Sequence, residues 1–296
     1  DPSLTLTDTM AGDETQVTAS TRSGRLVDIR DLSVSFQMAE HVVEAVRGVS
    51  LQIDRGETVA LVGESGSGKS VTALAVLQLL PYPKAFHPSG SIKIDGEEAV
   101  GGSDEFLQSI RGNKISMIFQ EPMTSLNPLH TIEKQIGEVL LLHQGMGQKA
   151  ARARILELLN MVGIKEPEKR LNSYPHQLSG GQRQRVMIAM ALANEPELLI
   201  ADEATTAVDV TIQAQILDLL EDIQRKTGMA MLIITHELGI VRKLAKRIYV
   251  MHQGKFVEEG DTAEVFANPS HEYTRMLIAS EPQPRTSTPD PNSPMM

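Results

Sequence analysis

Hydrophobic and polar positions alternate in the first part of the chain. Apolar side chains recur at nearly every second position over residues 26–36 and again over 46–53, and a polar turn separates the two runs. This period is typical of strands, and two such runs joined by a turn predict an antiparallel β layer. The next run, residues 58–62, is apolar after its first residue and predicts a buried strand that leads into a Gly-rich loop.

Helix and strand patterns alternate through much of the remaining chain. One helix is predicted from Lys69 to Pro81, and a second one ends near Arg111. Further strands are predicted at residues 91–95, 115–119, 198–201 and 231–234, with a hairpin over 247–258. Strands that alternate with helices predict an α/β fold whose parallel sheet is covered on both faces.

The middle of the chain, residues 121–194, carries no strand pattern. Over residues 148–162 the apolar positions fall on one helical face, and Gly163 supplies a stop signal. We therefore expect a helical subdomain, at about 121–181, inserted into the α/β domain.

Both ends of the chain have the composition of linkers. Residues 1–24 are rich in Asp, Thr, Ser and Gly and show no apolar period, which predicts a disordered leader. Residues 281–296 are rich in Pro, Ser and Thr and predict a linker or tail. The globular domain is expected to span residues 25–280.

Composition excludes several classes of function. The chain has 296 residues and a formal net charge of −10, without a dense Lys/Arg block, which argues against a nucleic-acid partner. It contains no Cys, so it forms neither disulfides nor thiolate metal sites, and it fits a reducing cytosol. Its longest apolar stretches, 71–80 and 186–193, fall short of the roughly 18–20 residues that span a bilayer. Any action at a membrane would therefore need separate membrane-embedded partners.

A phosphate-binding loop is the strongest chemical motif. Residues 63–70 fit the pattern G-x-x-x-x-G-K-[ST] between a buried strand and a helix, which is the context that the motif requires. The glycines allow backbone N–H groups to point at phosphate at the start of the helix. The predicted binding residues are Gly63, Glu64, Ser65, Gly66, Ser67, Gly68, Lys69 and Ser70. Lys69 is expected to neutralise the β and γ phosphates of ATP, and the Ser70 hydroxyl to ligate Mg²⁺; a plain Gly/Ser-rich turn is the alternative.

Two carboxylates follow the apolar strand at 198–201. Asp202 and Glu203 emerge at the end of that strand, where ligand sites of α/β proteins lie. We expect Asp202 to hold the Mg²⁺ shell and Glu203 to polarise the attacking water as a general base. An Asp-Glu pair after a strand is commonplace by itself, but with the phosphate-binding loop it predicts a P-loop NTPase with a RecA-like core.

The segment 178–182, Leu-Ser-Gly-Gly-Gln, separates the NTPase families. It resembles the signature of the ABC ATPases, which opens a helix. The resemblance implies that Ser179, Gly180, Gly181 and Gln182 cover the γ-phosphate bound by an opposite subunit. The alternative is an ordinary helix cap made by Ser179, which contributes about 1 kcal/mol.

Other positions match the ABC ATPases one by one. By resemblance, Gln120 contacts Mg²⁺ and the catalytic water, His236 contacts the γ-phosphate, and Asp209 reaches across the dimer. Ala204 and Val208 depart from the common Pro and Leu, which leaves the catalytic groups in place. Phe36 is the aromatic residue near the place where adenine would stack, and a core position in the β layer is an equally good interpretation.

Several longer stretches resemble the oligopeptide/dipeptide importer branch, namely residues 115–128, 174–181, 209–216 and 265–277. Residues 129–135 and 240–245 further resemble the microcin C-type peptide importers, which fuse two ATPase domains in one chain. The resemblance implies two membrane permease subunits and a second ATPase domain, fused or separate, in a head-to-tail dimer. It also implies a solute-binding protein as an indirect partner, and a peripheral position of this chain on the cytoplasmic face of the inner membrane.

Four alternatives compete with peptide import. Nickel and opine importers share the motifs of this branch and remain rivals for the cargo. Soluble ABC proteins of translation or DNA repair usually carry a coiled coil or a basic arm, and exporter ATPases are generally fused to membrane helices; neither feature is found. A non-hydrolysing half is disfavoured because the residues expected in hydrolysis are present, namely Lys69, Gln120, Asp202, Glu203 and His236.

Overall fold

A six-stranded sheet forms the centre of the protein. The computed structural model describes residues 24–118, 126–203 and 210–281. The strands stand in the order β11-β10-β3-β9-β8-β7, and only the edge strand β11 is antiparallel to its neighbour. Their bounds are β3 Thr58–Val62, β7 Ile115–Ile118, β8 Leu198–Asp202, β9 Ala230–Thr235, β10 Arg247–His252 and β11 Lys255–Asp261.

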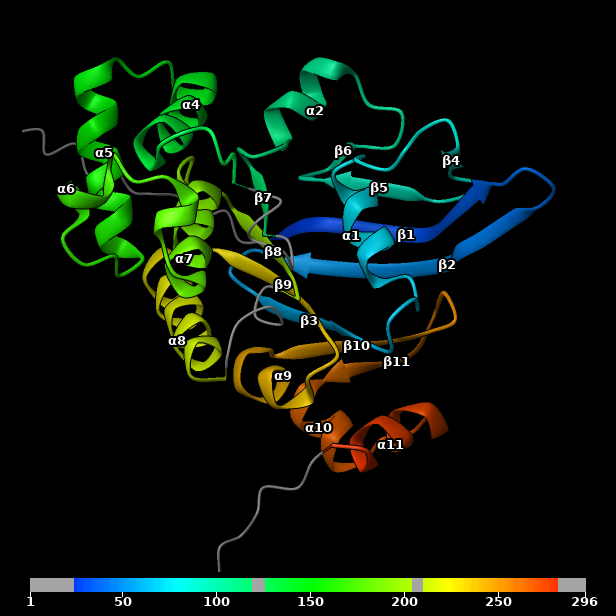
Figure 1. The fold of residues 1–296 in the computed structure, drawn as a ribbon. Helices are drawn as coiled ribbons and strands as arrows, with labels where there is room; N and C mark the ends of the chain where they lie inside the picture. The colour runs from blue at the N-terminus through cyan, green and yellow to red at the C-terminus, as the bar shows by residue number, and fades with distance from the viewer. Residues whose placement is uncertain (1–23, 119–125, 204–209, 282–296) are drawn as a thin grey trace, which may run out of the picture.

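A second, antiparallel sheet packs over this one (Figure 1). Its long strands β1 (Arg25–Gln37) and β2 (Val42–Asp54) pair antiparallel, as the alternation predicted. The short strands β4 (Ala85–Phe86), β5 (Ser91–Ile94) and β6 (Glu97–Glu98) complete the sheet, and helix α2 (Asp104–Ile110) follows.

Alternating side chains of the central strands divide between two layers. Val59 and Leu61 of β3 join α1 (Lys69–Val76) and the antiparallel sheet in one core cluster. Ala60 and Val62 of the same strand join the helices of the other face. The central sheet is therefore covered on both faces, by α1 with the antiparallel sheet on one side and by helices on the other, as predicted.

The helical subdomain lies beside β7 and β8 (Figure 1). It comprises α4 (Ile132–Gln144), α5 (Gln148–Met161), α6 (Pro167–Arg170), the 3₁₀ turn Pro175–Gln177 and α7 (Gly180–Leu192). With α8 (Val210–Thr227) these helices bury one large apolar cluster against β8 and β9. Among the described residues 126–194 there is no strand, which agrees with the sequence pattern.

The first helix is shorter than predicted. Helix α1 ends at Val76 and not at Pro81, because Gln78 adopts a left-handed conformation with φ of 53°. The Leu79 N–H then donates to the Leu74 carbonyl at 2.9 Å and closes the helix. The apolar residues that follow therefore belong to a turn that the periodicity could not distinguish from helix.

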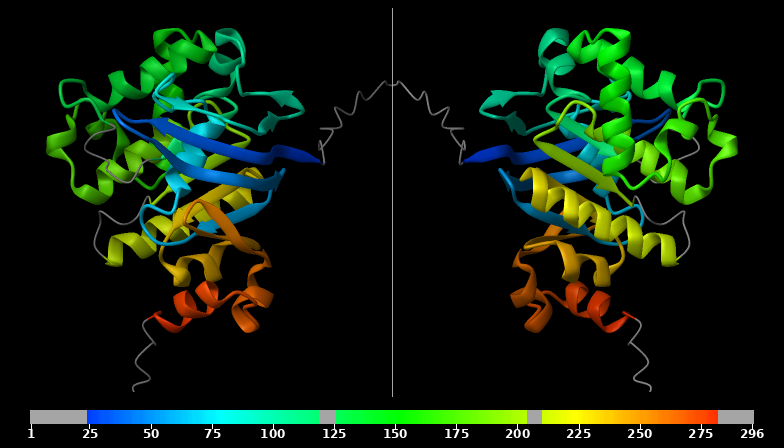
Figure 2. Two further views of the ribbon diagram at one scale, coloured as in Figure 1. Left: turned by 90° about the vertical axis from the view of Figure 1, so that its right-hand side faces the viewer. Right: turned by 90° about the vertical axis from the view of Figure 1, so that its left-hand side faces the viewer.

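The last two helices of the described residues, α10 (Thr262–Ala267) and α11 (Glu272–Ala279), are short, and no apolar period predicted them. They share a third core cluster with α9 (Leu238–Leu244), β3 and β10. In both views of Figure 2 the orange and red helices lie below the central sheet, beside the β10–β11 hairpin.

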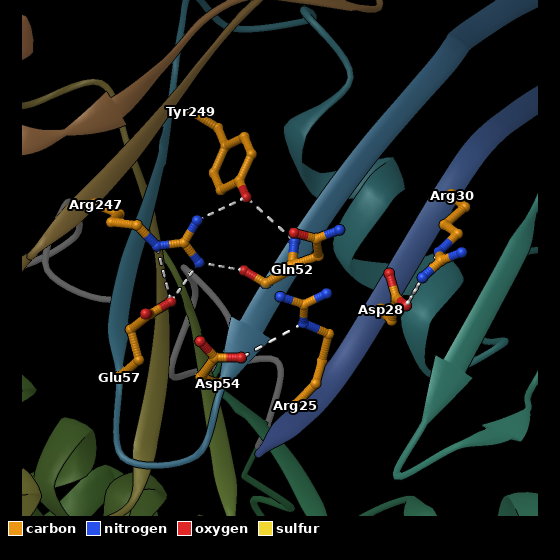
Figure 3. A network of polar contacts seen from close by, with 8 residues as sticks. All are labelled: Arg25, Asp28, Arg30, Gln52, Asp54, Glu57, Arg247 and Tyr249. Atoms are coloured by element: carbon orange, nitrogen blue, oxygen red, sulfur yellow. Dashed lines mark hydrogen bonds and ion pairs between the residues drawn. The ribbon is translucent and has the colours of Figure 1, made fainter. Parts of the chain in front are cut away.

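A polar network fastens the two sheets together (Figure 3). The Arg247 guanidinium of β10 binds the Glu57 carboxylate and donates to the Gln52 carbonyl at 2.7 Å. The Tyr249 hydroxyl accepts from the Gln52 N–H at 3.2 Å and from Arg247 at 3.1 Å. These bonds tie β10 of the central sheet to β2 of the antiparallel sheet.

No helix among the described residues is both long and apolar enough to cross a membrane.

Candidate nucleotide-binding site

The loop between β3 and α1 is shaped by its glycines. Gly63, Gly66 and Gly68 all have positive φ, at 154°, 80° and 108°. A Cβ on Gly63 would lie 2.2 Å from the Met251 carbonyl oxygen, and a Cβ on Gly68 would lie 2.8 Å from the Ala45 carbonyl oxygen. Only glycine therefore fits these two positions, and the predicted loop has the backbone that wraps around phosphate.

Two polar groups of this loop suit an anion. The Ser67 hydroxyl is buried and has no hydrogen-bond partner among the described residues. The Lys69 ammonium donates to the carbonyls of Gly63 and Glu64, the latter at 3.0 Å, so it folds back over the loop. A phosphate oxygen would give the Ser67 hydroxyl an acceptor and the ammonium a counter-charge.

Electrostatics at Lys69 also favour an anionic ligand. Lys69 is 5% exposed, and this burial lowers its pKa, although the carboxylates of Glu203, Asp202 and Glu64 act in the opposite direction. A buried ammonium is costly unless it is paired. The triphosphate of a nucleotide would supply that pairing.

Asp202 and Ser70 meet beside the lysine. Asp202 ends β8 and is 9% exposed, and burial raises the pKa of its carboxyl group. A hydrogen bond from the Ser70 side chain acts against this rise, whereas the Glu203 charge adds to it. A hydroxyl and a carboxylate thus stand together at the start of α1, and both are oxygen ligands of the kind that Mg²⁺ takes.

Glu203 and His236 form a pair at the ends of neighbouring strands. Glu203 has a left-handed φ of 48°, and its N–H donates to the Ile234 carbonyl of β9 at 2.8 Å. Its carboxylate Oε1 lies 3.1 Å from Nδ1 of His236. The Glu203 side chain is 14% exposed and the His236 side chain is 49% exposed, so at the carboxyl edge of the sheet the imidazole is open to solvent and the carboxylate is largely covered.

The signature segment caps a helix of the helical subdomain. The Ser179 hydroxyl accepts from the Gln182 N–H at 3.2 Å, and the Gln182 side chain accepts from the Ser179 N–H at 3.0 Å. Arg183 donates to the Leu178 carbonyl at 2.7 Å and fixes the preceding residue. The ordinary capping interpretation is therefore correct for this chain alone. A role for Ser179, Gly180, Gly181 and Gln182 toward a partner's nucleotide stays a prediction.

Comparison with known proteins shows the family. The family model described as ABC transporter matches residues 46–206, and these include the phosphate loop, the signature and both carboxylates. The chain belongs to the ABC transporter family. A second model, described as the C-terminal region of oligopeptide/dipeptide transporters, matches residues 257–293.

Two curated relatives illustrate the branch. The chain is 60% identical over 276 residues to the peptidoglycan transport ATP-binding protein YejF of Agrobacterium fabrum, which covers 93% of this chain and 50% of that protein. It is 52% identical over 261 residues to the oligopeptide transport ATP-binding protein OppD of Bacillus subtilis, which covers 88% of this chain and 73% of that protein. The chain spans about half the length of the first curated relatives that it matches.

Solved structures of ABC proteins have the same fold. One is a dimeric ATP-binding cassette in a post-hydrolysis state bound to ADP and Pi, with a TM-score of 0.71, 32% identity and coverage of 80% of this chain and 99% of that one. Another is CbiO1 of Clostridium perfringens, part of an ABC transporter complex, with a TM-score of 0.71, 27% identity and coverage of 82% and 91%. The solved structures confirm the predicted ABC fold, and the two family models with the curated relatives confirm the predicted family and its oligopeptide/dipeptide branch.

Two predicted site residues of this ABC protein fall outside the part of the chain that the structure describes, and a third, Phe36, packs on the core of the antiparallel layer. Gln120 and Asp209 lie outside the described residues, so their roles stay predictions. Phe36 is half-buried on β1, where it pairs with Val43 and packs on the main core. It therefore has the core position that the sequence left open, and its stacking on adenine also stays a prediction.

The structure adds a residue that the sequence patterns missed. The Tyr273 hydroxyl of α11 accepts a hydrogen bond from the Glu64 N–H of the phosphate loop at 3.0 Å. The two residues are 209 positions apart. The only sequence signal was that Tyr273 lies within residues 265–277, a stretch that resembles the importer branch.

Proposed function

We propose that this chain binds ATP with Mg²⁺ and hydrolyses it to drive import of peptides or peptide-like compounds by a membrane ABC transporter. One observation carries the ATPase proposal. Lys69, Ser70, Asp202, Glu203 and His236 stand together at the carboxyl ends of β3, β8 and β9, which are neighbours in the central sheet. A cation, a hydroxyl, two carboxylates and an imidazole at this edge are the groups that phosphoryl transfer uses.

The phosphate loop provides the binding step. Its positive-φ glycines let N–H groups turn toward the β and γ phosphates, and the N-terminus of α1 adds a favourable dipole. Lys69 is expected to leave the Gly63 and Glu64 carbonyls and pair with the phosphates, which replaces two neutral acceptors by charged ones.

The Ser70 hydroxyl and the Asp202 carboxylate would hold Mg²⁺, with Gln120 as a third ligand. Among the described residues no three His, Cys, Asp or Glu side chains group together as a metal site. Mg²⁺ is usually held by one or two carboxylates with water and substrate phosphates, and Asp202 would supply one such carboxylate. When bound, the ion neutralises charge on the transferred phosphoryl group.

Glu203 and His236 are assigned the hydrolytic step. Glu203 would accept a proton from the attacking water, and His236 would donate a hydrogen bond to the γ-phosphate. The 3.1 Å contact between them fixes the direction of both side chains before substrate arrives. The left-handed backbone at Glu203 is held by its bond to β9, and its carboxylate lies near enough to Lys69 and Asp202 to act on the pKa of both.

We further propose a head-to-tail pair of ATPase domains as the working unit. The signature opens α7 in the helical subdomain, whereas the phosphate loop lies between β3 and α1. The second domain would be fused beyond residues 281–296, which we interpret as a linker, or supplied by another chain. Residues 1–24 would be a leader, and 25–280 the nucleotide-binding domain with its helical subdomain at about 121–181.

Replacing Ser179 by Arg is expected to stop hydrolysis at the partner's site and leave ATP binding at this domain's own loop intact. The guanidinium and its bulk would occupy the place of the γ-phosphate that the partner binds. Photolabelling with an ATP analogue in the two-domain protein, followed by peptide mapping, would report each site separately. Ser173→Arg, a serine upstream of the signature whose N–H bonds the Arg170 carbonyl, is the matched control. Loss of labelling at residues 63–70 of the Ser179→Arg domain itself would contradict the trans arrangement.

Peptide import rests on resemblance to the named relatives. The proposed partners are two membrane permeases at the cytoplasmic face of the inner membrane and, indirectly, a solute-binding protein. Exposed leucines lie at both ends of α4, namely Leu129 (81% exposed) before its start and Leu141 and Leu142 (62% and 75%) near its end, and we propose that this helix docks on the permeases. We expect this part of the subdomain to transmit ATP-driven closure to the permeases.

An uptake experiment tests the cargo. Cells whose chromosomal copy of the complete gene carries Glu203→Gln are expected to lose uptake of radiolabelled tri- to hexapeptides and to keep uptake of nickel. The parent strain and a strain with Glu195→Gln serve as controls. Loss of nickel or opine uptake with peptide uptake intact would favour the rival importers, and no transport defect at all would favour a soluble ABC ATPase.

A further inference from the structure

The two C-terminal helices pack directly behind the phosphate loop. Val265 of α10 and Tyr273 of α11 are buried in the same cluster as Ala60 and Val62 of β3, the strand that leads into the loop. Figure 1 shows α10 and α11 beside the β10–β11 hairpin, below the central sheet. The segment that the oligopeptide/dipeptide model matches is thus part of the support for the nucleotide site.

A single phenol joins this element to the loop. The Glu64 N–H donates to the Tyr273 hydroxyl at 3.0 Å. Tyr273 is 5% exposed, and its ring stacks on the His252 ring with centroids 4.0 Å apart. Burial raises the pKa of Tyr273, which favours the uncharged phenol further, and the phenol oxygen accepts from the amide. Its position is therefore fixed by α11 on one side and by β10 on the other.

The β10–β11 hairpin holds the loop at two further points. The Gly254 N–H donates to the Ser67 carbonyl at 2.9 Å, and the Met251 carbonyl closely approaches Gly63. Between these two points the Glu64 carbonyl accepts from Lys69 and from the Ser67 N–H, whereas the Glu64 N–H donates to Tyr273. The backbone of the loop is thus braced by the β10–β11 hairpin and by α11.

The same element also contacts the segment after His236. Arg242 of α9 lies over the Phe266 ring, 4.4 Å from its centroid, and forms an ion pair with Glu281 at 2.9 Å. Helix α9 starts two residues after His236. The C-terminal helices therefore touch both the loop expected to bind phosphate and the helix that follows the expected γ-phosphate contact.

We propose that Tyr273 is a positioning residue for nucleotide binding, which holds the Glu64 amide and thereby the phosphate loop in its binding conformation. This inference rests on the proposed ATP binding. A loop that is already ordered loses less conformational entropy when phosphate binds. Tyr273 is not assigned to the reacting atoms, so its loss should raise Kd and KM for ATP and leave kcat unchanged.

The test compares two buried tyrosines in the full-length protein. Tyr273→Phe keeps the ring on His252 and removes only the hydroxyl. We expect Kd for a fluorescent ATP analogue to rise about three- to tenfold, the range for loss of one hydrogen bond. Tyr249→Phe is the matched control, because Tyr249 is 3% exposed and its hydroxyl also accepts a backbone N–H, that of Gln52 (Figure 3). It should lower the thermal midpoint without changing Kd.

A second measurement needs no nucleotide. In the ligand-free parent, the Glu64 amide should be protected from hydrogen exchange, and Tyr273→Phe but not Tyr249→Phe should remove that protection. Rapid exchange in the parent would overturn the inference. The inference would also be overturned if the parent binds the ATP analogue and Tyr273→Phe has the same Kd as the parent. The same holds if Tyr273→Phe and Tyr249→Phe lose equal affinity. A parent that binds no nucleotide at all would overturn the proposed function and this inference together.

Discussion

Replacing Glu203 by Gln is expected to slow ATP hydrolysis by about 10²–10⁴-fold, the contribution of a positioned general base. ATP should still bind, because Lys69 and the phosphate loop are unchanged. The amide has the same shape as the carboxylate and can still accept a hydrogen bond, so the contact with His236 is retained. What is lost is the basicity that removes a proton from water.

Phosphate release under saturating Mg²⁺ and ATP measures the rate, and titration with a fluorescent analogue measures binding. Glu195→Gln is the matched control, since Glu195 also has a left-handed backbone, with φ of 51°, and its side chain is 82% exposed. The control should hydrolyse ATP at the parent rate. Parent-like turnover by Glu203→Gln would show that another group is the base.

Replacing Lys69 by Ala is expected to raise Kd for ATP by about thirtyfold or more, since losing one partner of a buried charge pair costs about 2 kcal/mol or more. The triphosphate would lose the cation nearest to it in a site with little water. Equilibrium titration with a fluorescent ATP analogue gives the dissociation constant, and an unchanged value would contradict the assignment of the phosphate loop.

The same variant should lose little stability without nucleotide. Burial lowers the pKa of Lys69 below the unfolded value of 10.5, so its charge disfavours the folded state at neutral pH. This cost is fully present below the folded pKa and disappears as pH rises toward 10.5. Removing the charge relieves it, although two bonds to loop carbonyls are also lost.

Lys114→Ala is the matched control, because the charge of Lys114 stabilises the folded state whereas that of Lys69 destabilises it. Lys114 pairs with Asp95 at 2.7 Å, and this bond lowers the pKa of Asp95. A carboxyl group whose pKa is lowered by folding stabilises the folded state at pH values above its unfolded pKa. This stabilisation is lost as pH falls through the folded pKa. Lys114→Ala should therefore lower the thermal midpoint at neutral pH more than Lys69→Ala does, and leave Kd for ATP unchanged.

Much of this protein was predictable because its decisive signals are local. Alternating apolar residues in β1 and β2, the glycines of the phosphate loop and the Ser179 cap each act over a few residues, and each forms the predicted element. Local pattern failed at the end of α1, where the left-handed Gln78 ends the helix although the following residues are apolar. Nothing in the spacing distinguishes that turn from another helical turn.

The order of the strands was decided only by the tertiary structure. Every residue of β3, β8 and β9 is buried, so these strands carry no polar face from which a neighbour or a register could be deduced. Spatially β3 lies between β10 and β9, although β7 and β8 follow it in the chain. This order places Glu203 beside His236, 33 residues later.

The contact between Tyr273 and the phosphate loop is the clearest feature that only the tertiary structure decided. The sequence by itself determined the backbone of the loop at residues 63–70, because glycine positions and flanking elements specify it locally, and it predicts phosphate binding there. It did not determine that Tyr273, 209 residues after Glu64, supplies the acceptor for that residue's N–H. The sequence does not indicate which distant acceptor the Glu64 N–H will find, because any backbone amide can bond any hydroxyl. Packing of α11 against β3 and β10 brings these two groups together.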